Sequence, residues 1–432
     1  MNSEGNQLAS PRRIVPLTVD FEPKPAPPGW SWRLLTDLAR LESGHTPSRD
    51  HPEWWGGEIP WIALPDIRAL DGRIAFETSE HTNEQGIANS SARVLPAGTV
   101  VLSRTASVGF VTVMGRAMAT SQDFVNWVCG PALDPHFLAL LLRASRDYVR
   151  ELSSGATHKT VYVPTVKAFR ICLPPFREQQ QLASRINNLL EVTSAVHSVA
   201  LSRLNLALGL DKAYLAAAFP ASSSEWPMVS LGDVGEIVSG ITLGRRLNGT
   251  ATRSVPYLRV ANVKDGRLDT SDIYRIEATD NEIQKLTLRY GDLLLTEGGD
   301  ADKLGRGTFW DDQLPECIHQ NHIFRVRFDL DRFCPRFLAA QFASPYGKSY
   351  FLAHAKQTTG IATINQRVLA AFPLLAPPIE VQRRVASMLD ARMGETAKLC
   401  RSLTSQLHAI EAIPGALLQR TFGVVEPRDS AA

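Results

Sequence analysis

Three arginines in the first half of this 432-residue chain have the spacing of one helix face and the chemistry to hold an anion. Arg143, Arg146 and Arg150 stand at positions i, i+3 and i+7 of a helix that we expect to run from about Pro135 to Leu152. Guanidinium groups bind phosphate oxygens and the O6 and N7 edge of guanine, so these residues could position a nucleic acid. Acidic neighbours on the helix equally favour an ordinary solvated face, and both interpretations stay open.

Polar loops after expected strands supply further candidates for the same contacts. Recognition side chains are common in loops that a rigid scaffold holds, and a glutamine amide can read adenine. The same residue types also form tight turns and caps, so a structural role stays open for each. Gln122 and Gln320 occupy a position that both halves of the chain share, which favours a structural hydrogen bond for these two residues. The candidates are Arg104, Gln122, His158, Lys159 and Thr160 in the first half, and Lys303, Arg306, Gln320, Lys348, Lys356, Gln357, Asn365 and Gln366 in the second.

The sequence lacks the usual signatures of catalysis. It has no G-x-x-x-x-G-K-[ST] phosphate loop, no G-x-S-x-G nucleophile elbow and no H-E-x-x-H metal pair. Cys317, His319 and His322 are close in sequence, but the five cysteines form no C-x-x-C pair, so we expect no metal. We therefore expect a chain that is not an enzyme.

The composition is that of an ordinary globular protein, with 44% hydrophobic and 21% charged residues and a net charge of +2. No apolar run is long enough to span a membrane, and the N-terminus has no apolar signal region, so we expect a cytoplasmic protein without a membrane partner. Phosphate contacts need local positive charge, whereas 46 Lys and Arg nearly balance 44 Asp and Glu. A nucleic-acid surface would have to be concentrated on one face, or partner proteins would have to supply part of the charge.

A long segment occurs twice. Residues Pro174 to Phe219 recur without gaps as Pro377 to Phe422, and both copies share a Pro-Pro start and a glutamine, Gln179 and Gln382. Proline suits a helix N-terminus, and apolar residues at three- and four-residue spacing predict a long helix that pairs with another, most simply the other copy. The residues that we expect to pair are Leu182, Ile186, Leu189, Val196 and Val199 in the first copy, and Val385, Met388, Leu399, Leu403, Leu407 and Ile410 in the second.

A globular unit precedes each of these helices. The unit that opens at Trp30 recurs from Trp226, with Ser43-Gly44 matched by Ser239-Gly240. In both, short strands with turn signals precede one helix, a polar loop and a closing strand. The predicted fold class is α+β, with two tandem-repeated α/β domains separated by two long helices that form an antiparallel coiled coil. The expected parts are a flexible arm (1–29), a first domain (30–173), a first helix (174–220), a second domain (221–376), a second helix (377–423) and a tail (424–432).

This arrangement resembles the DNA-specificity (S) subunit of type I restriction-modification systems. The resemblance rests on the P-P-x-x-E-Q entry into the first long helix, at Pro174, Pro175, Glu178 and Gln179, and on its return after a second globular unit, where Val381 replaces the glutamate. It implies two target-recognition domains, each reading one half of a split, asymmetric site in double-stranded DNA. It also implies that the helices set the spacing between the half-sites and dock modification (M) methyltransferase subunits, two of them. S-adenosylmethionine, ATP and Mg²⁺ would belong to the M subunits and to the restriction (R) translocase-nuclease, and this chain would hold no cofactor.

Two alternatives stay open at this point. The same recognition module could work in another phage-defence complex or with a fused modification-cleavage polypeptide. The chain could also be a coiled-coil scaffold that carries two protein-binding domains.

Overall fold

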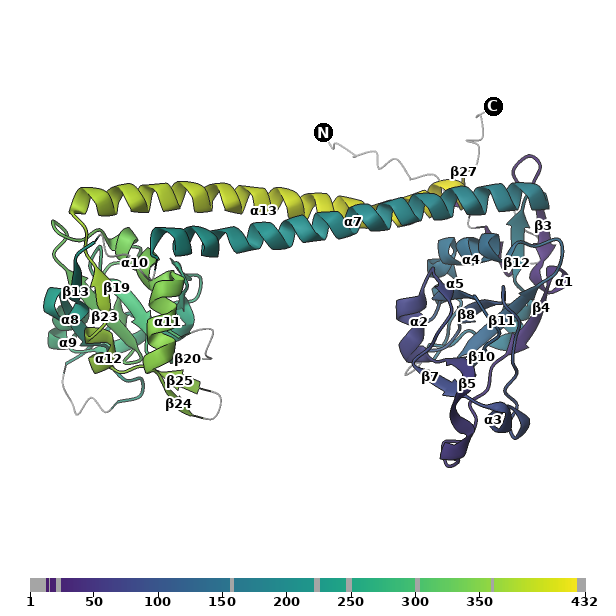
Figure 1. The fold of residues 1–432 in the computed structure, drawn as a ribbon, viewed down its shortest axis with the longest axis horizontal. Coiled ribbons are helices and arrows are strands. Elements are labelled where there is room, and N and C mark those ends of the chain that lie inside the picture. Colours follow the sequence, from purple (N-terminus) through teal and green to yellow (C-terminus); the bar gives the residue numbers. More distant parts are fainter. Residues whose placement is uncertain are drawn as a thin grey trace, which may run out of the picture. The chain divides into compact units, whose positions relative to one another are not determined.

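The computed structural model describes residues 13–14, 16–20, 25–155, 159–220, 226–245, 251–299, 304–358 and 361–425. The chain forms two compact units, of which the first comprises residues 1–199 with 407–432 and the second residues 200–406. Two long helices, α7 (Phe176–Ala218) and α13 (Ile379–Phe422), are each divided between the units (Figure 1). The predicted pair of α+β domains with two long helices is confirmed, but the boundaries of the units fall inside the helices.

The first unit is built around a five-stranded sheet in the order β4-β11-β8-β9-β6, antiparallel except for the parallel pair β6–β9. Smaller sheets, β10-β5-β7 and β2-β12-β3, adjoin it. The strands are β2 (Leu17–Thr18), β3 (Ser31–Leu34), β4 (Ala39–Ser43), β5 (Trp55–Ile62), β6 (Ile74–Ala75), β7 (Glu80–Thr82), β8 (Val100–Ser103), β9 (Val111–Met114), β10 (Ala119–Thr120), β11 (Phe124–Cys129) and β12 (Arg170–Leu173). The helices are α1 (Leu35–Leu38), η1 (Pro52–Trp54), α2 (Leu64–Leu70), α3 (Glu84–Ala88), α4 (Pro135–Ala144), α5 (Arg146–Glu151) and α6 (Val163–Lys167).

The second unit repeats this plan with a four-stranded antiparallel sheet in the order β14-β23-β19-β21. Its other sheets are β18-β15-β22, β16-β17, β13-β26 and β20-β25-β24. The strands are β13 (Met228–Ser230), β14 (Gly235–Ser239), β15 (Arg253–Leu258), β16 (Val263–Lys264), β17 (Arg267–Leu268), β18 (Tyr274–Ala278), β19 (Leu293–Thr296), β20 (Gly298–Gly299), β21 (Gly307–Phe309), β22 (Ile318–His319), β23 (Ile323–Phe328), β24 (Lys356–Thr358), β25 (Ile361–Thr363) and β26 (Pro373–Leu375). The helices are α8 (Leu231–Val234), η2 (Val260–Asn262), α9 (Asp280–Leu286), α10 (Pro335–Ala343), α11 (Pro345–His354) and α12 (Gln366–Ala370).

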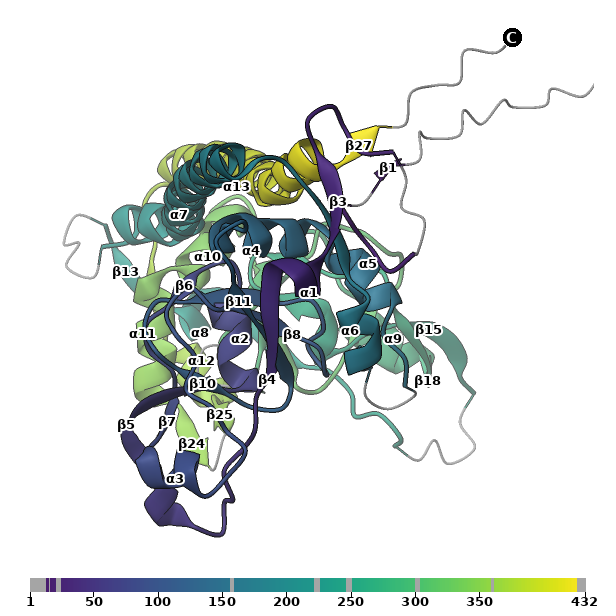
Figure 2. The same cartoon turned by 90° about the vertical axis from the view of Figure 1, so that its right-hand side faces the viewer.

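The ends of the described chain carry regular structure that the sequence did not predict. Leu17 is buried, and β2 pairs with β12, within the segment that we expected to be a flexible arm. Strand β1 (Arg13–Ile14) pairs with β27 (Val424–Val425), and Figure 2 shows the two side by side. Residues 13–14 and 17–18 of the expected arm and residues 424–425 of the expected tail are thus paired in strands.

Each expected domain helix is in fact two helices. The first is interrupted at Ser145, whose hydroxyl and backbone N–H both donate to the carbonyl of Leu141. The second is interrupted at Ser344, because Pro345 has no N–H to continue the helix and suits the first turn of a new one. The spacing rule that placed Arg143, Arg146 and Arg150 on one helix face does not apply across this break.

A trio of aromatic side chains joins each domain to a long helix. In the first unit, Phe137 of α4 lies 6.2 Å from Trp30 and 5.5 Å from Phe422, the last residue of α13, between ring centroids. The second unit has the same trio in Trp226, Phe337 and Phe219. Phe422 and Phe219 are both buried, so the start of one long helix and the end of the other belong to one core in each unit.

The long helices bury only part of the stripe that the apolar pattern predicted. Along α7 the buried and half-buried positions recur every three or four residues and include small or polar side chains such as Ala183, Thr193, Ala200 and Ala207. Small side chains let two helix backbones approach closely, but they carry little hydrophobic signal in a sequence. Of the predicted pairing residues, Ile186, Leu403 and Leu407 are buried and Leu182, Val385 and Ile410 half-buried, whereas Leu189, Val196, Val199, Met388 and Leu399 are exposed.

Candidate nucleic-acid interface

In the first domain, the loop after β8 meets the turn before β11. The backbone N–H of Arg104 donates to the carbonyl of Asp123 (2.9 Å), and its Nη2 donates to the carbonyl of Gln122 (2.8 Å). Gln122 is exposed, and its Oε1 accepts from the hydroxyl of Thr46 at 2.5 Å. The amide nitrogen of Gln122 has no hydrogen-bond acceptor among the described residues, so a donor points to solvent beside a held guanidinium.

A second loop, which follows α5, completes this cluster. The backbone N–H of Ala106 donates to the carbonyl of Lys159 (3.1 Å), and Thr105 and Thr160 form a β-bridge. Ala106 has a φ of 57°, a strained backbone for a residue with a side chain. The structure thus brings four of the predicted residues together at one edge of the domain: Arg104, Gln122, Lys159 and Thr160. The predicted residue His158 lies outside the described residues.

The arginines of α5 contact the segment that follows the 104–106 loop. Nη2 of Arg146 lies 2.6 Å from both oxygens of Asp71, and its Nε donates to the carbonyl of Gly109 (2.9 Å). Nε of Arg150 donates to the carbonyl of Val108 at 3.2 Å, and both guanidinium groups lie against the ring of Phe110. These contacts hold the segment that follows the 104–106 loop. Arg150 keeps a 45% exposed side chain, with Nη1 3.4 Å from Oδ1 of Asp147.

The second unit repeats this arrangement with a different cation. Nζ of Lys348 lies 2.8 Å from Oδ1 of Asp265 and 3.3 Å from the carbonyl of Gly305. Asp265 stands before a glycine in a turn, as Asp71 does, and Lys348 belongs to α11 as Arg146 belongs to α5. Because the contact recurs in both copies, a structural role for Arg146 and Lys348 has the stronger support.

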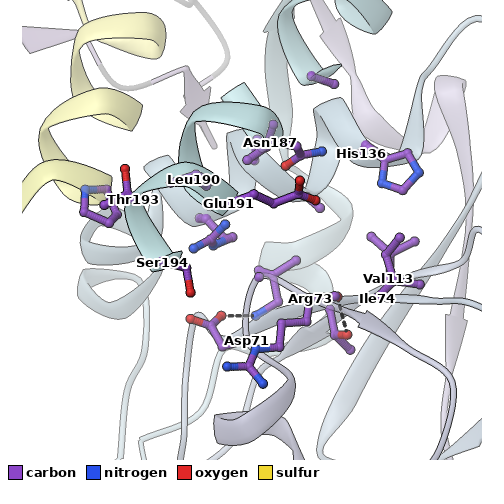
Figure 3. A pocket seen from close by; sticks show the side chains of 18 of the residues that line it. Asp71, Arg73, Ile74, Val113, His136, Asn187, Leu190, Glu191, Thr193 and Ser194 are labelled. Atoms are coloured by element: carbon purple, nitrogen blue, oxygen red, sulfur yellow. Dashed lines mark hydrogen bonds between the residues drawn. The ribbon is translucent and has the colours of Figure 1, made fainter. Parts of the chain in front are cut away.

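Arg143 lines a groove of about 790 Å³ beside α7. The domain side of this groove includes Asp71 and His136, and the helix side includes Asn187 and Glu191 (Figure 3). Burial lowers the pKa of the Arg143 guanidinium, and its buried Nε has no hydrogen-bond partner among the described residues. Arg143 therefore belongs to the junction of domain and helix and is not part of the loop cluster.

In the second domain, the equivalent position after β19 carries an acid. The N–H of Glu297 donates to the carbonyl of His322 (2.9 Å), as that of Arg104 donates to Asp123 in the first domain. Nδ1 of His322 donates to Oε2 of Glu297 at 2.6 Å, and Asn321 Nδ2 lies 3.3 Å from His322 Nε2. From the sequence, His322 was a candidate only for metal binding, and Glu297 was not a predicted contact residue.

These backbone contacts correct the proposed match between Gln122 and Gln320. The N–H of Gln320 donates to the carbonyl of Leu258, and in the first domain Ser121 makes the same bond to Ile62. Gln122 is therefore equivalent to Asn321, one residue later than the sequence comparison indicated. Gln320 accepts a hydrogen bond from the N–H of Val260 at 3.1 Å, which is a structural role, whereas Gln122 is exposed.

The other predicted residues of the second domain are distributed around this position. Lys356 is exposed on β24, and its strand pairs with β25, which in turn pairs with β20 next to Glu297. Gln357 is on the same strand. Asn365 caps α12 by accepting from the N–H of Val368. Gln366 donates to the carbonyl of Ile237, Arg306 is half-buried, and Lys303 lies outside the described residues.

Two buried glutamines attach the domains to the long helices, a role that the sequence did not reveal. Oε1 of Gln179 accepts from the N–H of Asp134 (3.0 Å), and its Nε2 donates to the carbonyls of Ala132 (3.1 Å) and Pro174 (2.9 Å). The second unit repeats all three bonds, with Gln382 bound to Cys334, Arg332 and Pro377. Both side chains are 1% exposed.

No group of three His, Cys, Asp or Glu residues within the described part of the chain could hold a metal ion. His319 is buried, its Nδ1 lies 3.1 Å from the carbonyl of Ile323, and burial lowers its pKa to about 4. Burial also raises the pKa of the Cys317 thiol to about 12, so the thiolate that would bind a metal is disfavoured. Among the described helices, none combines the length and the apolar character that crossing a membrane would require.

Residues 27–205 match the type I restriction modification DNA specificity domain family. This match covers the first domain and most of α7. The specificity subunit of the type I restriction enzyme MjaIX from Methanocaldococcus jannaschii is 25% identical over 266 residues, which are 57% of this chain and 61% of that subunit. The StySPI specificity subunit from Salmonella potsdam is 20% identical over 419 residues, or 92% of this chain and 89% of the relative.

Two solved structures share the fold of this chain. A chain from a study of complex assembly and conformational transition of the type I R-M system has a TM-score of 0.69 at 20% identity, covering 93% of this chain and 99% of that one. The crystal structure of the HsdS subunit from Thermoanaerobacter tengcongensis has a TM-score of 0.58 at 19% identity, covering 93% of this chain and 98% of that one. The likeness extends over both domains and both long helices.

Proposed function

We propose that this chain is the non-catalytic subunit that selects the DNA sequence in a type I restriction-modification complex, each domain reading one half of a split site. The observation that carries the proposal is the duplicated loop cluster, in which the same backbone contacts present Arg104 and Gln122 in one domain and Glu297 and Asn321 in the other. Equivalent scaffolds with different polar side chains are what two readers of different half-sites need. The site should therefore be asymmetric.

The long helices supply surfaces for partner subunits. Leu189, Val192, Val196 and Val199 form an exposed apolar stripe on α7, with exposed fractions between 42% and 61%. Such a stripe is typical of a helix that packs against another protein. We assign it to the modification subunits, two in the complete complex, which would bring S-adenosylmethionine, while ATP and Mg²⁺ would act in the restriction subunit.

The test is co-expression of this chain with the modification subunit encoded beside it, followed by sequencing of the host DNA for methylated bases. We expect one split, asymmetric motif. Exchange of residues 30–173 for those of another specificity subunit should change one half of the motif, and exchange of residues 226–376 should change only the other half. A soluble complex that methylates no motif would contradict the proposal and favour a protein-binding scaffold.

A further inference from the structure

The residue that follows the central strand has opposite charge in the two domains. Strands β8 and β11 pair with Ser103 opposite Phe124, and strands β19 and β23 pair with Thr296 opposite Ile323. The next residue in each domain, Arg104 or Glu297, donates its N–H to the residue just before the partner strand. One scaffold position thus carries a donor-only side chain in one domain and an acceptor-only side chain in the other.

A hydrogen bond from His322 holds the carboxylate of Glu297 in place through one of its two oxygens. Its Oε2 accepts from Nδ1 of His322, and Oε1 has no hydrogen-bond donor among the described residues. This bond fixes the proton of His322 on Nδ1, so Nε2 can accept from the amide of Asn321. The side chain of Glu297 is 32% exposed, so its second oxygen can reach a ligand.

A carboxylate in a DNA-reading loop has few uses. Phosphates repel it, so it cannot serve to position the backbone. Base edges in the major groove offer it amino hydrogens, and the cytosine N4 amino group is the donor that Glu suits. The equivalent guanidinium of Arg104 suits the O6 and N7 acceptors of guanine instead.

We propose that Glu297 is a specificity-determining residue of the second domain, which accepts a hydrogen bond from the N4 amino group of one cytosine in its half-site. His322 is the positioning residue that orients the carboxylate. The inference rests on the proposed DNA-recognition function and names the side chain and the base on which one half of the specificity depends.

The test replaces Glu297 by glutamine in the full chain, co-expressed with its modification subunit, and reads the methylated motif of the host DNA. Glu297→Gln keeps the shape but adds an amide donor, so one position of one half-site should lose its requirement for cytosine. Methylation of sites with another base there should rise roughly tenfold to a hundredfold relative to the cytosine site, as expected for one lost base contact. The other half-site should not change. Glu277→Gln, the same change at an exposed glutamate of the same domain, should leave the whole motif unaltered.

The outcomes separate this inference from the proposed function. If the wild-type complex methylates no motif, the proposed function fails. If the wild type has a split motif that Glu297→Gln leaves unchanged, or if the relaxed base pair contains no cytosine, the assignment of Glu297 is overturned. A second variant, His322→Gln, should relax the same base pair by a smaller factor. Relaxation of a different base pair would show that His322 reads a base itself, and this too would overturn the assignment.

Discussion

Replacement of Gln179 by alanine should lower the stability of the first unit far more than its single amide group suggests. The change removes the acceptor for the N–H of Asp134 and the donor for the carbonyls of Ala132 and Pro174, in a site that is 1% exposed. A buried group left without a partner costs about 1–3 kcal/mol, and the carbonyls are less costly to leave than the N–H. We therefore expect a loss of about 2–4 kcal/mol, which corresponds to a melting temperature lower by roughly 5–12 °C for a unit of this size.

Differential scanning calorimetry of the full chain measures this effect, since two units can give two transitions. Gln180→Ala is the matched control, because it changes the same residue type on an exposed position of the same helix and has the same helix propensity. Hydrogen exchange of the Asp134 amide gives a direct second measurement and should accelerate only in Gln179→Ala. The reasoning is refuted if Gln179→Ala melts within about 1 °C of Gln180→Ala. Gln382→Ala should reproduce the loss in the second unit, because Gln382 makes the same three bonds there.

Three further predictions concern the other contacts. Asp71→Asn leaves the half-buried Arg146 without its anionic partner, so the free energy of unfolding of the first unit should fall by about 1–3 kcal/mol. Asp265→Asn removes the partner of Lys348 in a more exposed pair, and the free energy of unfolding of the second unit should fall by less than about 1 kcal/mol. Thermal unfolding measures both changes. Val196→Lys on the exposed stripe of α7 should leave the melting temperature of the free chain unchanged and weaken binding of the modification subunit at least tenfold in titration calorimetry, while a lysine at an exposed polar position of the helix should not. The folded-state pKa of His319 is lowered to about 4 from an ordinary 6.5, so its neutral form contributes stability above pH 6.5 that is lost as the pH falls through 6.5 toward 4. The second unit should lose up to about 3 kcal/mol over this range, and His319→Gln should remove that slope between pH 6.5 and 5; an unchanged slope would contradict a buried neutral imidazole.

The architecture could be predicted from the sequence because the duplication marks it. The paired Pro-Pro starts of the long helices and the recurrent Trp30 and Trp226 are visible without coordinates. The complete buried stripe of the long helices could not be predicted from the sequence. Ala183 and Ala200 pack at buried positions because they are small, whereas a hydrophobic pattern favours residues such as Val199, which is exposed.

The loop cluster was predicted only in part, because the sequence does not show which residues of the two domains are equivalent or which distant side chains pair. The equivalence of Gln122 and Asn321 depends on strand pairing, which a sequence comparison shifted by one residue. Arg146 has the residue type and spacing of a phosphate contact, yet its ionic partner Asp71 is far away in sequence and only the fold brings them together. Glu297 was not predicted as a contact residue, because carboxylates are not expected in a DNA-binding surface. Its structural equivalence to Arg104 is what makes it a candidate.

The division of both long helices between the units also decides the order in which the chain can fold during synthesis. The second unit is one continuous stretch, residues 200–406, and all of it is translated before the last turns of α13. The first unit begins at the N-terminus but has Leu418 and Phe422 in its core, packed with Phe137. The domain that is translated first is therefore the one that is completed last, and until then its core lacks the aromatic ring of Phe422.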